Sequence, residues 1–278
     1  MPPSPIDRGI VLITGASSGI GADLARHIAP RAARLLLAAR RLDRLEQLRA
    51  ELTPRAPQTR IDLYKTDLDN PADLRQLADG ILRDTDNYGL DVLVNNAGFG
   101  HADLFERAPW DRLESMVRVN VIAPMYLIHR FLPLMVSRHR GGILNISSGG
   151  GRVPMVGSAT YSATKYAIRG LSETLMLELA GAGVRVTESA PGPVATEFSQ
   201  TAGTKHLPGR PPEFVRITSD RCARESIAAF DRAKPVVYPG QPYRTLMRLL
   251  SILPRPLIHR GPRRAALRLR AQYEAPTP

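Results

Sequence analysis

Short apolar runs and amphipathic stretches alternate through the first two thirds of the chain. The runs expected to form buried strands are 9–14, 35–39, 60–65, 91–94, 142–146 and 184–189. Between them, apolar side chains recur at helical spacing over 19–29, 42–52, 71–85, 109–137 and 158–180. Strands that alternate with helices need crossover connections, and these connections produce a parallel sheet. The pattern therefore predicts an α/β fold, a doubly wound Rossmann-type sheet with a ligand crevice at the carboxyl ends of its strands.

The last part of the chain departs from this alternation. Two stretches, 243–253 and 261–273, mix apolar side chains with arginine. Residues 232–273 include nine Arg and one Lys but no Asp or Glu. This segment therefore accounts for ten of the twelve net positive charges. We therefore expect residues 1–240 to form a single Rossmann-type domain, and residues 241–278 to form a basic, amphipathic, helical C-terminal extension.

The extension has three interpretations. Basic amphipathic helices bind anionic lipid, so one interpretation is peripheral association with a membrane surface. The others are a cover over the substrate pocket and a contact between subunits. Nucleic-acid binding is not expected, because the body of the chain is nearly neutral and Tyr243 and Tyr273 are the only aromatic residues between 242 and 273.

Composition narrows the setting in which the protein works. With 278 residues, 43% of them hydrophobic, the chain is long enough to bury a sizeable core. Its single cysteine, Cys222, excludes an internal disulfide and fits a reducing cytoplasm. We expect a cytoplasmic protein, because no signal peptide is visible and no apolar run approaches the roughly 18 residues of a membrane span. None of the six histidines has the spacing of a zinc site, so no metal is expected.

A glycine-rich loop follows the first predicted strand. It reads Thr14-Gly15-Ala16-Ser17-Ser18-Gly19-Ile20-Gly21 and opens a predicted helix. Glycines let the backbone approach a pyrophosphate, whose charge meets the N-terminus of the helix. The spacing is GxxxGxG, which differs from the usual GxGxxG dinucleotide fingerprint. Taken alone, such a loop also serves as a turn without a ligand.

The loop resembles the cofactor loop of the short-chain dehydrogenase/reductase family, in its compact single-domain branch. Four further motifs of that family follow in the family's order over about residues 8–200: Asp67-Leu68, Asn95-Asn96-Ala97-Gly98, the set Ser148, Tyr161 and Lys165, and Pro191-Gly192 with Thr196. The resemblance implies that all these motifs surround a nicotinamide dinucleotide. Asp67 and Leu68 would lie at the adenine, Asn95, Ala97 and Gly98 along the adenine–ribose side, and Val194 and Thr196 at the carboxamide and phosphate.

The end of the second strand indicates which cofactor is bound. An acidic side chain there would accept hydrogen bonds from a ribose 2′-hydroxyl and repel a 2′-phosphate. The position that resembles the family's acidic site is Ala39, and Arg40 and Arg41 follow it. Guanidinium groups suit a phosphate, so we expect NADP(H) rather than NAD(H). The alternative is a solvated pair of charges that ends the strand.

Tyr161 and Lys165 are candidate catalytic residues. They are four residues apart, so they lie on one face of the predicted helix. A free phenol titrates near pH 10, and a nearby ammonium with the oxidised nicotinamide should lower the pKa of Tyr161. Ser148, thirteen residues before Tyr161, can donate to the oxygen that gains charge, although Ser147 is a neighbouring candidate. Asn120 matches the family's fourth catalytic residue, which supports a water-linked proton path to the lysine.

These residues indicate an NADP(H)-dependent oxidoreductase that moves hydride between the nicotinamide and a carbonyl or alcohol. The alternative is a non-catalytic NADP(H)-binding regulator of the same fold. Substrate selection is expected from 99–105, 149–157 and 196–216, where apolar side chains indicate a lipophilic or neutral small molecule. The resemblance also implies a homodimer or homotetramer built on the helices 109–137 and 158–180.

Overall fold

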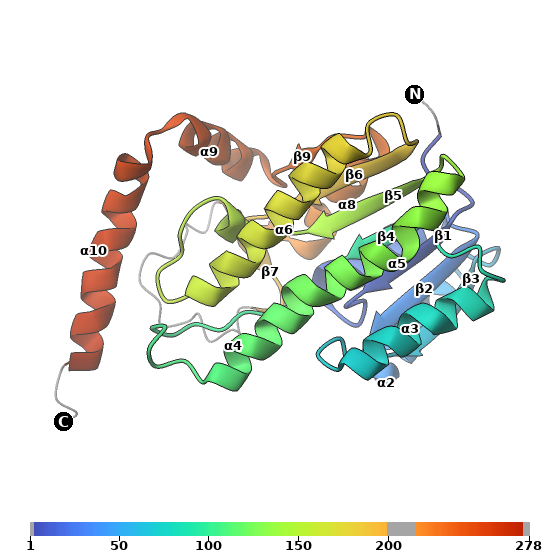
Figure 1. Cartoon of the computed structure of the whole chain (residues 1–278), viewed down its shortest axis with the longest axis horizontal. Coiled ribbons are helices and arrows are strands. Elements are labelled where there is room, and N and C mark those ends of the chain that lie inside the picture. Colours follow the sequence, from blue (N-terminus) through green and yellow to red (C-terminus); the bar gives the residue numbers. More distant parts are fainter. Residues whose placement is uncertain (1–2, 199–214, 275–278) are drawn as a thin grey trace.

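The structure is a computed structural model that describes residues 3–198 and 215–274 (Figure 1). Its main sheet has seven strands in the order β3-β2-β1-β4-β5-β6-β9. All neighbouring strands are parallel, which confirms the predicted doubly wound sheet. The strands are β1 (Ile10–Thr14), β2 (Arg34–Ala39), β3 (Arg60–Lys65), β4 (Val92–Asn95), β5 (Gly141–Ile146), β6 (Val184–Ser189) and β9 (Val236–Val237).

Helices cover both faces of the sheet (Figure 1). One face carries α3 (Pro71–Asp84), α4 (Trp110–Val117), α5 (Ala123–Ser137) and α6 (Ala159–Glu178), and the other carries α1 (Gly19–Ile28), α2 (Leu42–Leu52) and α8 (Ser219–Asp231). Successive strand residues point to opposite faces, so β1 contributes to two apolar cores. Leu12 packs with Phe131 of α5, and Ile13 packs in the cluster that contains Leu24 of α1. This two-sided burial explains why the central strands are apolar throughout.

The stretch predicted as one helix over 109–137 is interrupted. α4 runs directly into a π-helical turn, η1 (Arg118–Ile122), before α5 begins. Such turns hold one more residue than a regular turn and occur at functional sites. The π turn carries Asn120, which is 2% exposed.

The combined helix Trp110–Ser137 is long and apolar enough, by length and composition, to cross a membrane. Its inner face is packed in the core, where Leu127 and Phe131 are fully buried. A core helix of this kind passes the same test, so we interpret it as part of the domain.

Between β6 and the predicted helical extension, the chain forms elements that the sequence pattern does not predict. A two-residue strand, β7 (Val194–Ala195), pairs with β8 (Ile217–Thr218), and α8 and β9 follow. Two helices end the described chain, α9 (Gln241–Ile252) and α10 (Arg255–Glu274). α9 is anchored on the domain through Tyr243 and Met247, which are buried with Val215. α10 stands at the side of the domain in Figure 1.

The strand order reverses between β1 and β4, and this reversal positions the candidate site. Loops that leave neighbouring strands in opposite directions open a crevice at the carboxyl ends. The side chain of Asn96, just after β4, donates to the carbonyl oxygens of Thr14 at 2.9 Å and of Gly15 at 3.1 Å. The glycine loop is therefore held to the end of β4.

Candidate active site

Ser148, Tyr161 and Lys165 come together beyond the end of β5. Ser148 follows that strand, and the other two lie one turn apart near the start of α6. The Ser148 hydroxyl accepts from the Gly150 amide at 3.1 Å and lies close enough to the Tyr161 phenol to act on its pKa. The Lys165 ammonium lies 5.7 Å from the centre of the Tyr161 ring. By contrast, the Ser147 hydroxyl is turned to the backbone, donating to the Lys165 carbonyl at 3.5 Å.

Burial dominates the acid–base properties of this cluster. Tyr161 is 8% exposed and Lys165 is 6% exposed. Burial raises the pKa of Tyr161 to about 12, and the hydrogen bond with Ser148 acts in the opposite direction. Burial also lowers the pKa of Lys165 to about 8. The lowered phenol pKa expected from the sequence does not arise from the protein alone, because loss of hydration outweighs the interaction with Ser148.

A buried acidic residue acts electrostatically on the lysine. Glu188 on β6 is 1% exposed, and its negative charge acts to raise the pKa of Lys165. It forms an ion pair with Arg152, which also binds Glu173 on α6 at 2.9 Å. The carboxylate and the ammonium therefore belong to one charged network inside the domain.

Asn120 holds two segments of the site together. Its amide nitrogen donates to the carbonyl of Phe99 at 2.9 Å and to the hydroxyl of Thr164 at 3.2 Å. Its amide oxygen accepts from the Phe99 backbone amide at 3.0 Å. A Cβ on Gly98 would lie 3.0 Å from the Asn120 Oδ1 and 3.7 Å from the Lys165 Nζ. The asparagine, the lysine and the end of β4 are thus adjacent.

The glycine loop has the close backbone packing expected of a ligand cradle. Gly15 has φ +66° and Gly19 has φ +55°, values that favour glycine. A Cβ on Gly21 would lie 2.3 Å from the carbonyl oxygen of Gly15. The loop therefore turns sharply and leads into the N-terminus of α1, where backbone N–H groups favour an anion.

Comparison with known proteins identifies this arrangement. The family model for short chain dehydrogenases matches residues 9–206. The chain belongs to the short-chain dehydrogenase family. An oxidoreductase of Myxococcus xanthus (strain DK1622) is 33% identical over 256 residues, which cover 91% of this chain and 96% of that protein.

Two solved structures have the same architecture. A short-chain dehydrogenase from Sphingobium yanoikuyae in complex with NADPH is 31% identical, with a TM-score of 0.75 over 88% of this chain and 96% of that chain. The bulky-bulky ketone specific alcohol dehydrogenase from Comamonas testosteroni is 28% identical, with a TM-score of 0.74 over 91% of this chain and 94% of that chain. The family assignment thus holds in both sequence and fold.

The short-chain dehydrogenase crevice fits a dinucleotide. Thr196 packs against the glycine loop, because a Cβ on Gly19 would lie 3.1 Å from its Cγ2. Arg41 donates to the Ser18 hydroxyl at 2.9 Å and to the Ser17 hydroxyl at 3.3 Å. Polar donors and bare backbone therefore surround the space next to the N-terminus of α1, as a pyrophosphate requires.

The structure places the other cofactor candidates around the same sheet edge. Asp67 accepts from the Asp69 amide at 3.1 Å, and Leu68 packs against the core on the α3 side. Asn95 is 5% exposed, and its amide nitrogen donates to Asn145 at 2.9 Å. The amide oxygen of Asn95 is buried and has no partner among the described residues, and Ala97 and Gly98 lie beyond the end of β4. Pro191, Gly192 and Val194 follow β6, and Arg40 is exposed after β2.

Part of the predicted substrate wall lies outside the described residues, namely 199–214. The described part includes Phe198, whose ring is 5.5 Å from that of Tyr161, centre to centre. Phe105 and Met155 are 59% and 40% exposed. These apolar side chains lie on the segments expected to face a substrate.

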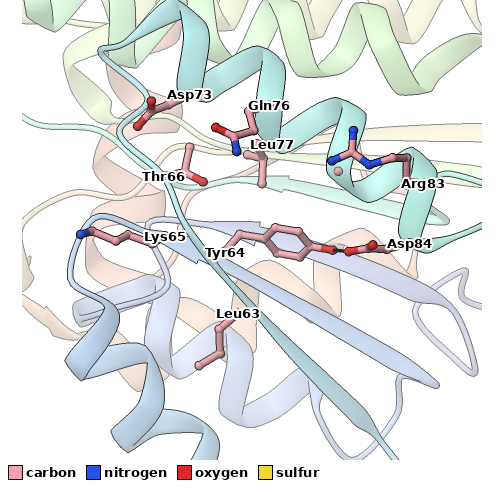
Figure 2. A pocket seen from close by; sticks show the side chains of 10 residues that line it. Leu63, Tyr64, Lys65, Thr66, Asp73, Gln76, Leu77, Arg83 and Asp84 are labelled. Atoms are coloured by element: carbon pink, nitrogen blue, oxygen red, sulfur yellow. Dashed lines mark hydrogen bonds between the residues drawn. The ribbon is translucent and has the colours of Figure 1, made fainter.

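A separate hollow of about 310 Å³ lies at the sheet edge between β3 and α3 (Figure 2). Tyr64 lies across it, and its hydroxyl donates to Asp84 at 2.6 Å. Lys65 and Asp73 lie toward one end and Arg83 toward the other. None of the catalytic candidates lines this hollow, so we place the reaction elsewhere, at the carboxyl ends of β1, β4 and β5.

Three groups at the site have no role of their own in the sequence predictions, although Asn96 is quoted there as part of a motif. Asn96 clamps the glycine loop, and Glu197 forms ion pairs with Arg41 at 3.2 Å and Arg44 at 2.8 Å. Glu188 is the third, and here a signal existed, because an acidic residue within a run expected to be a buried strand needs a partner. Within the described ranges, no group of three or more His, Cys, Asp or Glu side chains could hold a metal ion.

Proposed function

We propose that the protein is an NADP(H)-dependent oxidoreductase that interconverts a carbonyl and an alcohol on a neutral, lipophilic small molecule. The observation that carries the proposal is the grouping of Ser148 and Tyr161 with the buried Lys165, whose ammonium lies 5.7 Å from the centre of the Tyr161 ring. This cluster lies at the same end of the sheet as the glycine loop. A proton donor and a cofactor cradle therefore share one crevice.

Each member of the cluster has a role in carbonyl reduction. When bound, the reduced nicotinamide supplies the hydride. Tyr161 donates its phenolic proton to the carbonyl oxygen, and in the reverse direction its phenolate accepts the proton of the alcohol. Ser148 donates a hydrogen bond to the same oxygen as negative charge develops there. The Lys165 ammonium stabilises the phenolate that remains.

Asn120 acts as a positioning residue in this proposal. It fixes the segment after β4 to the start of α6 through Phe99 and Thr164. Its amide oxygen and the Lys165 ammonium both lie close to the position that a Cβ on Gly98 would take. This placement agrees with a proton path that reaches the lysine through water.

The preference for NADP(H) rests on Arg40 and Arg41. Ala39 leaves the end of β2 without a carboxylate, so a 2′-phosphate meets no repulsion there. In the structure Arg41 and Arg44 both bind the carboxylate of Glu197. The same guanidinium groups suit a phosphate, which would replace that carboxylate. The related Sphingobium enzyme in complex with NADPH is consistent with this preference.

The deciding experiment follows nicotinamide absorbance with purified protein and a series of ketones and aldehydes of rising chain length. Each substrate is run with NADPH and with NADH, beside a Tyr161→Phe variant. We expect NADPH oxidation to be faster with the longer, lipophilic carbonyls and to fall by about 100-fold or more in the variant, because general acid catalysis contributes at least that factor.

The alternative, a non-catalytic NADP(H)-binding regulator, makes the opposite prediction. It requires tight NADPH binding without turnover on any carbonyl. The complete set of Asn120, Ser148, Tyr161 and Lys165 favours an enzyme, because a binding protein has no need of a proton donor. Equal rates for the wild type and Tyr161→Phe would remove the proposed mechanism.

We also propose that the protein is a homo-oligomer whose interface uses α4, α5 and α6. On one face of the sheet, α4 and α5 form one continuous helix, and α6 lies alongside it (Figure 1). These helices and the π turn between α4 and α5 expose apolar side chains to solvent, including Trp110 at 67%, Ile122 at 51% and Leu177 at 72%. Several large exposed apolar side chains on this face of the molecule favour an interaction surface there.

We infer, finally, that the α9–α10 junction binds an anionic membrane surface. Its exposed apolar side chains are Leu246, Leu249, Ile252, Leu253 and Leu257. Arginines surround them in a stretch without acidic residues between 232 and 273. Apolar side chains flanked by arginine fit the headgroup region of an anionic leaflet. A membrane location would also suit a lipophilic substrate.

A further inference from the structure

Helix α9 delivers one aromatic side chain, Tyr243, to the neighbourhood of the active site. The turn before the helix is fixed by Gly240, which has φ +90° and donates its amide to Glu225 at 3.0 Å. Arg244 then binds the same carboxylate at 2.6 Å and the carbonyl of Tyr238 at 3.1 Å. Because its neighbours on both sides are anchored, Tyr243 is held in one place.

Two glycines leave the room that Tyr243 fills. The ring lies directly on the backbone of Gly192, where an added Cβ would fall 2.7 Å from the Cδ2 of the tyrosine. The hydroxyl reaches Gly149, where an added Cβ would fall 1.9 Å from it. Gly149 is the residue after Ser148, and its amide donates to the Pro191 carbonyl at 2.9 Å. The phenol therefore ends beside the catalytic serine.

The hydroxyl of Tyr243 has no hydrogen-bond partner among the described residues, although its side chain is buried and only 6% exposed. A buried hydroxyl without a partner costs free energy, and a phenylalanine would fill the same space without that cost. Burial also raises the pKa of Tyr243, so the phenol keeps its proton near neutral pH. The side chain therefore carries an unpartnered donor beside Gly149, the residue that follows Ser148.

We propose that the Tyr243 hydroxyl hydrogen-bonds a second oxygen of the substrate, next to the carbonyl that Ser148 and Tyr161 bind. The substrate class is then a carbonyl compound with a further oxygen on a neighbouring or next-but-one carbon, such as a diketone or a hydroxyketone. The inference deepens the proposed function and rests on it. It also gives the C-terminal helices a part in specificity, because α9 supplies the contact.

The test compares Tyr243→Phe with the wild type on three ketones of one chain length: a monoketone, an α-diketone and a β-diketone. Phenylalanine keeps the ring on Gly192 and removes only the hydroxyl. We expect kcat/KM for at least one diketone to fall by up to about tenfold, the worth of one hydrogen bond, with the monoketone unchanged. NADPH binding, measured by fluorescence, and the melting temperature should stay at or above the wild-type values.

Each other result overturns a defined part of the inference. An equal loss on all three ketones would make Tyr243 a packing residue, and no loss on any of them would show that the hydroxyl is not used. If the wild type itself turns over none of the ketones while Tyr161→Phe behaves identically, the proposed function fails, and the inference fails with it. If the wild type and Tyr243→Phe both turn over the monoketone, the proposed function holds, and only the inference about the Tyr243 hydroxyl is being tested.

Discussion

Lys165 carries a charge where water hardly reaches. The side chain is 6% exposed, its ammonium donates to the Ile146 carbonyl at 3.0 Å, and its pKa falls to about 8. A lowered pKa in the folded state means that the unfolded chain binds the proton more tightly. Below about pH 8 Lys165 is charged in the folded protein, and this buried charge lowers the free energy of unfolding. The destabilisation is relieved as the pH rises from about 8 toward the ordinary lysine pKa of 10.5.

Because the buried charge destabilises the fold, Lys165→Met should stabilise the protein while it abolishes activity. At neutral pH we expect a gain of about 1–3 kcal/mol in the free energy of unfolding, since the buried charge is removed and one hydrogen bond is lost. The gain should shrink between pH 8 and 10. Denaturant unfolding of both proteins across this range measures it, and a variant less stable than the wild type at neutral pH would contradict it.

At the scale of elements, the site depends on a seam between α6 and the short turn η2 (Gly149–Gly151) that follows Ser148. A Cβ on Gly151 would fall 2.6 Å from the carbonyl oxygen of Lys165, which belongs to the helix backbone. The turn and the helix touch here without room for a side chain. Their contact sets how the serine faces the tyrosine.

Gly151→Ala should therefore separate the two elements. We expect a loss of about 1–3 kcal/mol in stability from overpacking, and a drop in kcat because Ser148 moves relative to Tyr161. The matched control is Gly170→Ala on the same helix, where an added Cβ meets nothing within 4 Å. That variant should gain about 0.5–1 kcal/mol and keep full activity. Urea unfolding measures the stability of the two variants, and nicotinamide absorbance measures their kcat. Identical behaviour of the two variants would contradict the proposed role of the contact between η2 and α6.

Most elements before residue 190 could be predicted from the sequence, because each has a clear period. β3 and α2 begin and end at the predicted residues, Arg60–Lys65 and Leu42–Leu52. β7, β8 and β9 could not be predicted, since two residues are too few to show an alternation. The π turn at Arg118–Ile122 was also hidden, because one extra residue barely shifts the apolar pattern of a long helix.

The candidate site was likewise predictable only in part from the sequence. The spacing of Tyr161 and Lys165 on one helix places them together from sequence alone. Contacts between distant segments do not follow from spacing, so the pairing of Glu197 with Arg41 and the approach of Tyr243 to Gly149 required the fold. The direction of the Tyr161 pKa required it as well, because burial depends on all the surrounding elements.

At the scale of the whole molecule, two exposed apolar surfaces lie on different elements and should serve different partners. Leu177 on α6 is 72% exposed, and Ile252 on α9 is 78% exposed. We expect Leu177→Glu to dissociate the oligomer while binding to anionic vesicles persists. Ile252→Glu should keep the oligomer and weaken vesicle binding, because a carboxylate opposes both burial and the anionic surface.

Size-exclusion chromatography with light scattering and vesicle co-sedimentation measure the two properties on the same proteins. Neutral vesicles serve as the control for charge. Loss of assembly in Ile252→Glu would assign the α9–α10 junction to a subunit contact instead. Unchanged assembly in Leu177→Glu would remove the proposed interface on α4, α5 and α6.

The contact of Tyr243 with Gly149 and Gly192 also has an evolutionary consequence. Neither glycine can gain a side chain while the tyrosine stays, because the added Cβ would overlap its hydroxyl or its ring. Descendants of this protein that acquire alanine or valine at Gly149 must change Tyr243 to a smaller residue at nearly the same time. The three positions should therefore mutate as a group, and a lineage that breaks the group should also have changed the molecules on which it acts.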